Sequence, residues 1–209
     1  MLRVKKAELG FVAAKPGALP PDSLPQVAMM GRSNAGKSSL LNKLIGRKKL
    51  ARVAKAPGRT REINFFRLDD RGYLVDLPGF GYARVPGKVR QAWGKLVGSY
   101  LESSGSLNLA VHLVDIRHDP TPLDRMLRDM LIELGIPFVV ALTKSDKLSR
   151  SAGLQRLSVA RKVLDLPQDI EIVATSSVDG TGVPRLVGLI DRALRNDGGR
   201  RDENGPCLG

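Results

Sequence analysis

Residues 31–38 constrain the fold more than any other part of this sequence. They read GRSNAGKS, which fits the pattern GxxxxGK[ST], and they lie between an apolar run at 27–30 and a segment with helical leucine spacing at 37–45. A strand, a glycine-rich turn and a helix in this order predict a phosphate-binding loop, because glycines let backbone N–H groups face a phosphate and the helix N-terminus adds partial positive charge. A glycine-rich turn without a ligand is the alternative. The pattern predicts a bound nucleoside triphosphate and leaves its base open.

Apolar runs alternate with helical segments along the rest of the chain, which is typical of parallel strands joined by crossover helices. The expected strands are 27–30, 63–68, 73–77, 107–116, 136–142 and 170–174. The expected helices are 37–45, 88–103, 122–134, 154–164 and 183–195. The strands at 63–68 and 73–77 are separated by a DDRG turn, so we expect them to form a hairpin. The fold class is therefore α/β, a three-layer P-loop NTPase with a mostly parallel six-stranded sheet, one antiparallel strand and helices on both faces.

The 209 residues suit one large domain, and 42% hydrophobic residues are enough for a core. We expect an N-terminal extension over 1–24, the nucleotide-binding domain over 25–195 and a flexible tail over 196–209. Cys207 is the one cysteine, so a disulfide framework within the chain is excluded and a reducing, cytoplasmic location is expected. We expect no signal peptide and no membrane span, because the apolar runs are shorter than a bilayer requires.

Residues 143–146, TKSD, follow the expected strand 136–142 and match the guanine motif [NT]KxD. The Asp146 carboxylate can accept from both the ring N–H and the exocyclic amine of guanine, whereas adenine presents an acceptor at that position. Lys144 is expected over the base, where it also supports the phosphate loop. The TSS segment at 175–177 is expected to bring backbone amides to the guanine carbonyl. A surface Lys-x-Asp pair is the alternative.

Residues 76–79, DLPG, match the DxxG pattern of a γ-phosphate sensor. Asp76 is expected to hold Mg²⁺ through water, and the Gly79 N–H to contact the γ-phosphate. Thr60 is the candidate switch hydroxyl that reaches Mg²⁺ when the γ-phosphate is present. An ordinary Asp-x-Pro-Gly turn and a strand-entry threonine are the alternatives.

These motifs define the candidate site residues. The nucleotide contacts are Gly31, Arg32, Ser33, Asn34, Ala35, Gly36, Lys37, Ser38, Ser39, Pro57, Gly58, Arg59, Thr60, Asp76, Leu77, Pro78, Gly79, Thr143, Lys144, Ser145, Asp146, Thr175, Ser176 and Ser177. The Mg²⁺ ligands are Ser38, Thr60 and, through water, Asp76. The catalytic candidates are Lys37, Thr60, Gly79 and Asn34.

The chain is strongly basic, with 34 Lys and Arg against 21 Asp and Glu and a net charge of +13, which favours a polyanionic partner. Two runs without acidic residues, 47–61 and 84–95, fall on the expected switch regions. The candidate RNA contacts are Lys48, Lys49, Arg52, Lys55, Arg84, Lys88 and Arg90. Order in these segments with GTP would make RNA affinity depend on the nucleotide. A solvated charged face is the alternative.

The order and spacing of the motifs match the translation-factor-related class of GTPases. GRSNAGKSSLLN, PGRTREINFF, VDLPGFGYA, VDIRHDPTPLD and TKSDKL closely resemble the EngB/YsxC family of ribosome-assembly GTPases. The resemblance implies a Ras-like G domain that binds GTP and GDP with Mg²⁺, hydrolyses GTP and assists assembly of the large (50S) ribosomal subunit. It implies a cytoplasmic monomer that contacts rRNA, not DNA or membrane, and is needed for normal growth, septation and cell division.

Hydrolysis is expected to be slow, because Phe80 follows the DxxG pattern where many GTPases carry a glutamine that orients water. In related GTPases an asparagine at the position of Asn34 helps hold K⁺ against the phosphates, so we hypothesise potassium-stimulated turnover. A loop-stabilising amide is the alternative role of Asn34.

Three other functions stay open at this point: a GTPase switch with a non-ribosomal partner such as division or membrane machinery, a basic P-loop ATPase or kinase, and an RNA-binding scaffold with a degenerate site. Outside the motifs, core positions are expected at Trp93, Leu96, Val97, Tyr100 and Leu101, with contacts to a partner as the alternative, and His112 is expected to be a hydrogen-bonded core histidine. No role is assigned to Asp115, Arg117 or His118.

Overall fold

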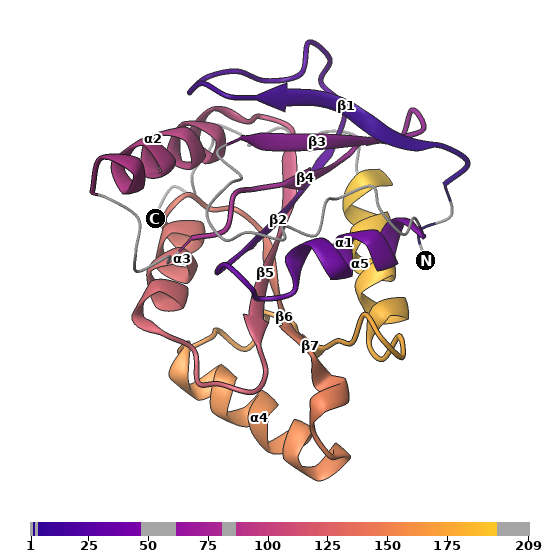
Figure 1. The fold of residues 1–209 in the computed structure, drawn as a ribbon, viewed down its shortest axis with the longest axis vertical. Helices are drawn as coiled ribbons and strands as arrows, with labels where there is room; N and C mark the ends of the chain where they lie inside the picture. The colour runs from indigo at the N-terminus through magenta and orange to yellow at the C-terminus, as the bar shows by residue number, and fades with distance from the viewer. Residues whose placement is uncertain (1, 3, 47–61, 81–86, 196–209) are drawn as a thin grey trace, which may run out of the picture.

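The computed structural model describes residues 2, 4–46, 62–80 and 87–195, with the backbone alone over 87–93. Seven strands form one sheet: β1 (Ala7–Ala13), β2 (Gln26–Gly31), β3 (Ile63–Leu68), β4 (Tyr73–Asp76), β5 (Leu107–Asp115), β6 (Phe138–Thr143) and β7 (Ile172–Ala174). The helices are α1 (Lys37–Ile45), α2 (Gly87–Ser103), α3 (Pro122–Glu133), α4 (Arg150–Val163) and α5 (Val183–Arg195), with a 3₁₀ turn η1 (Ser145–Lys147). The strand order is β1-β3-β4-β2-β5-β6-β7 (Figure 1).

Only β3 runs against the other strands of this sheet, since it is antiparallel to both neighbours, β1 and β4. The expected α/β architecture with one antiparallel strand is confirmed, whereas the expected count of six strands is wrong. The seventh strand is β1, whose residues pair with β3 from Ala7 with Leu68 to Ala13 with Ile63. Most of its residues are exposed, as is usual at a sheet edge, so the strand lacks the apolar alternation that reveals a half-buried one.

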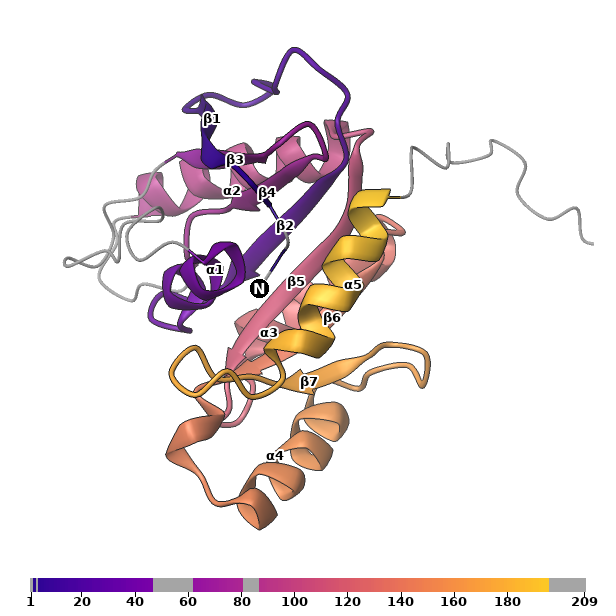
Figure 2. The same cartoon turned by 90° about the vertical axis from the view of Figure 1, so that its right-hand side faces the viewer.

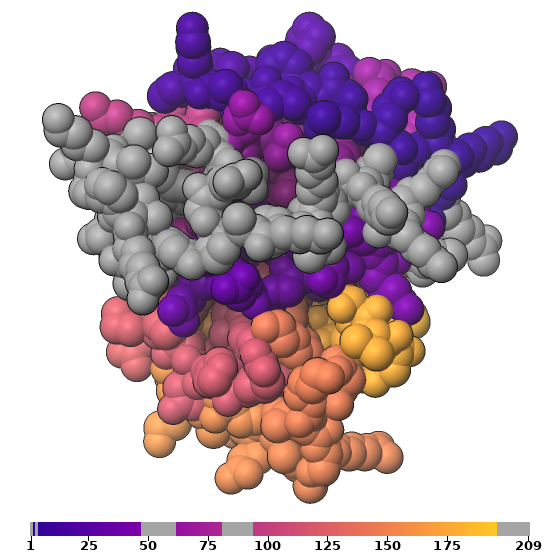
Figure 3. Space-filling view, viewed as in Figure 1, coloured from indigo at the N-terminus to yellow at the C-terminus, as the bar shows by residue number. Residues whose placement is uncertain are grey.

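Helices cover both faces of the sheet (Figure 2). On one face α1 and α5 contribute Leu40, Leu44 and Leu186 to a buried cluster with Val27 and Met29 of β2. On the other face α2, α3 and α4 contribute to a second buried cluster, which contains the alternate residues of the same strand, Ala28 and Met30. The three predicted layers are therefore present, and β2 and β5 lie in the middle of the sheet. Figure 3 shows the N-terminal residues at one end of the molecule's face and α4 at the other.

An aromatic cluster ties the edge strand to the core. Phe65 of β3 is fully buried, and its ring lies edge-on to Phe11 of β1, Tyr73 of β4 and Tyr100 of α2, with centroids 5.6, 6.0 and 5.7 Å away. Burial raises the pKa of Tyr100, whose protonated hydroxyl donates to Oε1 of Gln26 at 3.0 Å. The cluster therefore joins both antiparallel pairs and the helix above them.

Three boundaries differ from the expected ones by two or more residues, and one of them is the start of β6, which begins at Phe138 rather than at 136. α4 begins at Arg150 rather than at 154, because the Ser149 side chain caps it by accepting from the Ala152 N–H at 3.3 Å. β7 begins at Ile172 rather than at 170. The expected core positions 96, 97, 100 and 101 of α2 are confirmed as buried, and the side chain of Trp93 lies outside the described part of the chain. Within the described ranges, no helix combines the length and the apolar character needed to cross a bilayer.

Replacing Phe65 by alanine should lower the free energy of unfolding by about 3–5 kcal/mol, because it removes a fully buried ring and leaves a cavity between four elements. Urea denaturation followed by circular dichroism measures the change. Leu154→Ala is the control, since 62% of that side chain is exposed. A loss for Phe65→Ala no larger than the control would show that the cluster is not part of the stabilising core.

Candidate functional site

The phosphate loop spans the turn between β2 and α1. A Cβ at Gly31 would lie 2.7 Å from the carbonyl oxygen of Leu113 on β5, so the end of β2 can approach β5 this closely only as glycine. Asn34 and Gly36 have left-handed backbones with φ of 68° and 85°, which bend the chain into α1. The loop is thus a curved backbone segment at the start of a helix, as the motif requires.

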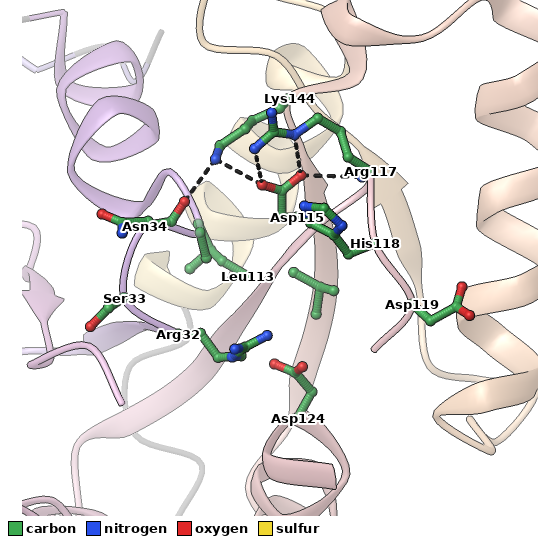
Figure 4. Close-up of a pocket in the computed structure, with 12 residues that line it drawn as sticks. Arg32, Ser33, Asn34, Leu113, Asp115, Arg117, His118, Asp119, Asp124 and Lys144 are labelled. Atoms are coloured by element: carbon green, nitrogen blue, oxygen red, sulfur yellow. Dashed lines mark hydrogen bonds and ion pairs between the residues drawn. The ribbon is translucent and has the colours of Figure 1, made fainter. Parts of the chain in front are cut away.

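Residues at the carboxyl end of β6 donate hydrogen bonds to backbone carbonyls of the phosphate loop. The Thr143 hydroxyl, which is buried, donates to the carbonyl oxygen of Ala35 at 2.6 Å. Lys144 Nζ donates to the carbonyl oxygen of Asn34 at 2.8 Å and to Asp115 Oδ2 at 2.8 Å (Figure 4). The guanine motif expected from the sequence and the phosphate loop are therefore in direct contact.

Lys37 and Asp76 form a buried ion pair between α1 and β4. Their side chains are only 10% and 9% exposed, and Lys37 Nζ donates to Asp76 Oδ1. Ser38 stands beside Lys37 in the first turn of α1. An ammonium, a carboxylate and a hydroxyl gathered at a helix N-terminus fit a phosphate with bound Mg²⁺, because Mg²⁺ prefers oxygen ligands and the lysine suits the phosphate charge.

The DLPG segment at 76–79 is bound to the phosphate loop through its backbone. The Ser33 N–H donates to the Phe80 carbonyl at 2.9 Å, and the Phe80 N–H donates to the Gly31 carbonyl at 3.3 Å. A Cβ at Gly79 would lie 3.1 Å from Ser33 Oγ, so the close approach favours glycine. Phe80 is 8% exposed and belongs to the hydrophobic core, so its ring is packed away from solvent.

The base-reading end is formed by η1 and the loop after β7. Ser176 Oγ donates to Asp146 Oδ1 at 2.8 Å, and this hydrogen bond lowers the pKa of Asp146, which stays a carboxylate. Two backbone amides of the TSS segment are used by the fold, since the Thr175 N–H donates to the Leu142 carbonyl at 2.7 Å and the Ser176 N–H to the Thr181 carbonyl at 2.9 Å. Within the described part of the chain, the Ser177 N–H has no backbone acceptor, so it is the amide of this segment that the fold leaves available to a guanine carbonyl.

The structure brings four of the expected segments to one edge of the sheet, at the carboxyl ends of β2, β4, β6 and β7: residues 31–39, 76–79, 143–146 and 175–177. Other candidates lie outside the described residues: Pro57, Gly58, Arg59, Thr60, Lys48, Lys49, Arg52, Lys55 and Arg84. Lys88 and Arg90 lie on α2, where the structure describes the backbone alone.

A polar cavity of about 220 Å³ adjoins the phosphate loop and was not expected from the sequence. Arg32 and Asp124, from the loop and from α3, point toward one another across it (Figure 4). His112 Nε2 lies 3.6 Å from Asp124 Oδ1, with both side chains buried. Among the described residues, the two ring nitrogens of His112, Asp124 Oδ1 and Arg32 Nε have no hydrogen-bond partner. His112 is therefore a core residue as expected, but it is not hydrogen-bonded.

One sequence signal for this cavity was overlooked. Thr121 and Asp124 form a capping box at the start of α3, in which Asp124 Oδ2 accepts from the Thr121 N–H at 2.8 Å. The spacing Thr-x-x-Asp before an apolar helix predicts such a box. The contact between Asp124 and His112 joins residues on different elements, and no local pattern encodes it.

Replacing Thr143 by valine should lower the free energy of unfolding by about 1–3 kcal/mol, because the Ala35 carbonyl loses its buried donor while the side-chain shape is kept. Equilibrium denaturation without nucleotide measures this effect. If stability were unchanged, the hydroxyl would not hold the loop in the free protein.

Comparison with known proteins agrees with this geometry. The model of the family described as "50S ribosome-binding GTPase" matches residues 26–144. The chain is 46% identical over 191 residues to a probable GTP-binding protein EngB of Pelotomaculum thermopropionicum, covering 91% of this chain and 96% of that protein. It is 44% identical over 179 residues to the corresponding protein of Syntrophomonas wolfei, covering 86% and 93%.

Solved structures show the same fold. The crystal structure of a probable GTP-binding protein engB matches with a TM-score of 0.68 and 27% identity, covering 81% of this chain and 98% of that one. The structure of Era in complex with MgGDPNP and a segment of 16S ribosomal RNA matches with a TM-score of 0.64 at 21% identity, which supports the fold alone. The sequence and the structure thus agree that this chain belongs to the EngB family of GTP-binding proteins, a family of P-loop GTPases.

Proposed function

We propose that this protein is a GTP-hydrolysing switch that binds the large ribosomal subunit, or its precursor, according to the nucleotide it holds. The observation that carries the proposal is the backbone pairing of Phe80 with Gly31 and Ser33. It joins the phosphate loop to the segment that leads into the second basic run at 84–95. The description of the matching family, a 50S ribosome-binding GTPase, supports the choice of partner.

Each half of the site has a separate task in this proposal. Lys37 contacts the β- and γ-phosphates, while Ser38, Thr60 and, through water, Asp76 hold Mg²⁺. When bound, the Mg²⁺ ion would offset the negative charge that develops on the phosphates during hydrolysis. The buried Lys37–Asp76 pair supports these roles, because it places both groups at the N-terminus of α1.

The base is selected at the other half of the site. The Asp146 carboxylate, oriented by Ser176, accepts from the guanine ring N–H and amine, and the Ser177 N–H donates to the guanine carbonyl. An adenine base would leave these buried groups unpaired. The site therefore favours GTP and GDP over ATP.

Slow hydrolysis follows from Phe80. Its ring is packed in the core, and its side chain has no atom that could orient a water molecule. We propose that K⁺ held beside Asn34 raises the rate, since a cation there would offset charge as an arginine finger does. Asn34 is exposed at the loop surface, which leaves its side chain accessible to an ion.

The basic runs supply the ribosomal contacts in this proposal. Their lysines and arginines would neutralise rRNA phosphates, and nucleotide-dependent order of the switch segments would set the affinity. A role in large-subunit assembly, and through it in growth and septation, completes the proposal.

Co-sedimentation with purified large subunits tests the proposal, with a non-hydrolysable GTP analogue and with GDP. We expect tighter, salt-sensitive binding with the analogue. Replacing Lys48, Lys49 and Arg52 by glutamine should weaken binding and reduce the log–log salt slope by about two to three, because each of the three lost phosphate contacts removes a little under one unit. GTP affinity should not change.

The matched control removes the same charge from another surface. Lys162, Arg192 and Arg195 are exposed positions on α4 and α5, outside both basic runs of the sequence. Their triple glutamine variant should bind the subunit as the wild type does. Equally weak binding with both nucleotides, or an equal loss of subunit binding in both triple variants, would show that the basic residues provide only nonspecific affinity for RNA.

The potassium hypothesis is tested by GTPase assays in KCl and NaCl at matched ionic strength. We expect turnover at least about tenfold faster in KCl, because a fixed cation stabilises charge in the transition state. Asn34→Gly should abolish the difference, since glycine keeps the left-handed backbone at φ 68° and removes only the amide. Equal rates in the two salts would end the hypothesis.

A further inference from the structure

We propose that Asp115 and Arg117 are positioning residues for guanine-nucleotide binding, which hold the Lys144 ammonium against the back of the phosphate loop. They thereby fix the base-reading half of the site relative to the phosphate-reading half. This inference rests on the proposed nucleotide site and adds two residues that its sequence motifs do not contain. Asp115 is the last residue of β5 and Arg117 lies in the turn that follows, and neither position belongs to the expected nucleotide contacts.

Lys144 is held at two points. Its Nζ donates to the Asn34 carbonyl oxygen at 2.8 Å and to Asp115 Oδ2 at 2.8 Å (Figure 4). Its own backbone is left-handed, with φ 63°, so the side chain leaves β6 at a sharp turn toward the loop. Without Asp115 the ammonium would keep one neutral carbonyl as its protein acceptor, and a partly exposed lysine chain has many alternative rotamers.

Asp115 is itself fixed by Arg117. Arg117 Nε donates to Oδ1 at 3.0 Å, Nη2 to Oδ2 at 2.8 Å, and the Arg117 N–H to Oδ1 at 3.1 Å. Burial alone would raise the pKa of Asp115, but the hydrogen bonds from Arg117 and Lys144 outweigh it and hold the pKa well below its usual range. The carboxylate is therefore anionic at neutral pH, and hydrogen bonds hold both of its oxygens.

The arrangement connects three segments that are far apart in the sequence. The loop after β2, the end of β5 and the end of β6 meet at one ammonium group. None of these contacts involves the segment at 76–79 that senses the γ-phosphate. Asp115 should therefore support the binding of GTP and GDP equally, which distinguishes it from a residue of the hydrolytic machinery.

A double-mutant cycle tests the proposal on the full-length protein. The variants are Asp115→Asn, Lys144→Ala and their combination, with Kd values measured for fluorescent GDP and a fluorescent non-hydrolysable GTP analogue. Asp115→Asn should weaken both ligands about tenfold, the usual scale for loss of an orienting partner. Lys144→Ala should weaken them at least as much, and adding Asp115→Asn to it should cause no further loss.

Asp119→Asn is the matched control, because it makes the same chemical change four residues further along the chain, in the loop that follows β5. Its side chain is 66% exposed and is paired with Arg156 at 2.7 Å, away from Lys144. It should leave both Kd values unchanged. Thermal unfolding without nucleotide is recorded for each variant, so that loss of affinity is compared at known stability.

The outcomes separate the inference from the proposed site. Unchanged affinity in Asp115→Asn, or a loss that simply adds to that of Lys144→Ala, would overturn the positioning role. Unchanged affinity in Lys144→Ala would overturn the site assignment itself. If Asp115→Asn does not fold, the cycle is repeated with Arg117→Ala in its place. Arg117→Ala alone should weaken nucleotide affinity about threefold, and it should cause no further loss when combined with Lys144→Ala.

Discussion

The approach of Gly31 to Leu113 is the constraint on which the site depends. These residues belong to the central parallel strands β2 and β5, and a side-chain carbon at residue 31 would lie within 2.7 Å of a backbone oxygen. The strands stay paired up to this point, and the phosphate loop departs immediately after it. A larger residue would push the loop away from β5, and with it the carbonyl groups that Thr143 and Lys144 bind. The absence of a Cβ atom at Gly31 thus determines how closely the phosphate loop lies to β5.

The parts of the fold that the sequence predicts are those with local signals. The phosphate loop has a fixed glycine spacing, and the central strands are mostly apolar. The edge strand β1 escaped prediction because most of its middle residues are exposed, and its pairing with β3 is a contact between segments at least 50 residues apart. The start of α4 depends on one serine cap, which the apolar periodicity does not reveal.

The candidate site shows the same division. The motif residues could be predicted, because their spacing reflects backbone shape around a ligand. The use of the Thr175 and Ser176 amides by the fold could not, since their acceptors are set by tertiary packing. The unpartnered nitrogens of His112 and the role of Asp115 likewise depend on side chains that meet only in the folded chain.

The buried pair of Lys37 and Asp76 has a consequence for the order in which ligands arrive. A divalent cation that enters alone meets a carboxylate whose charge is already matched and an ammonium that repels it. Phosphates offer the ammonium a stronger partner, and the carboxylate then becomes available to the metal. Metal and nucleotide affinities are therefore coupled, and by thermodynamic linkage each must strengthen the other by the same factor. In the proposed site, a divalent cation would therefore bind weakly before the nucleotide and strongly together with it.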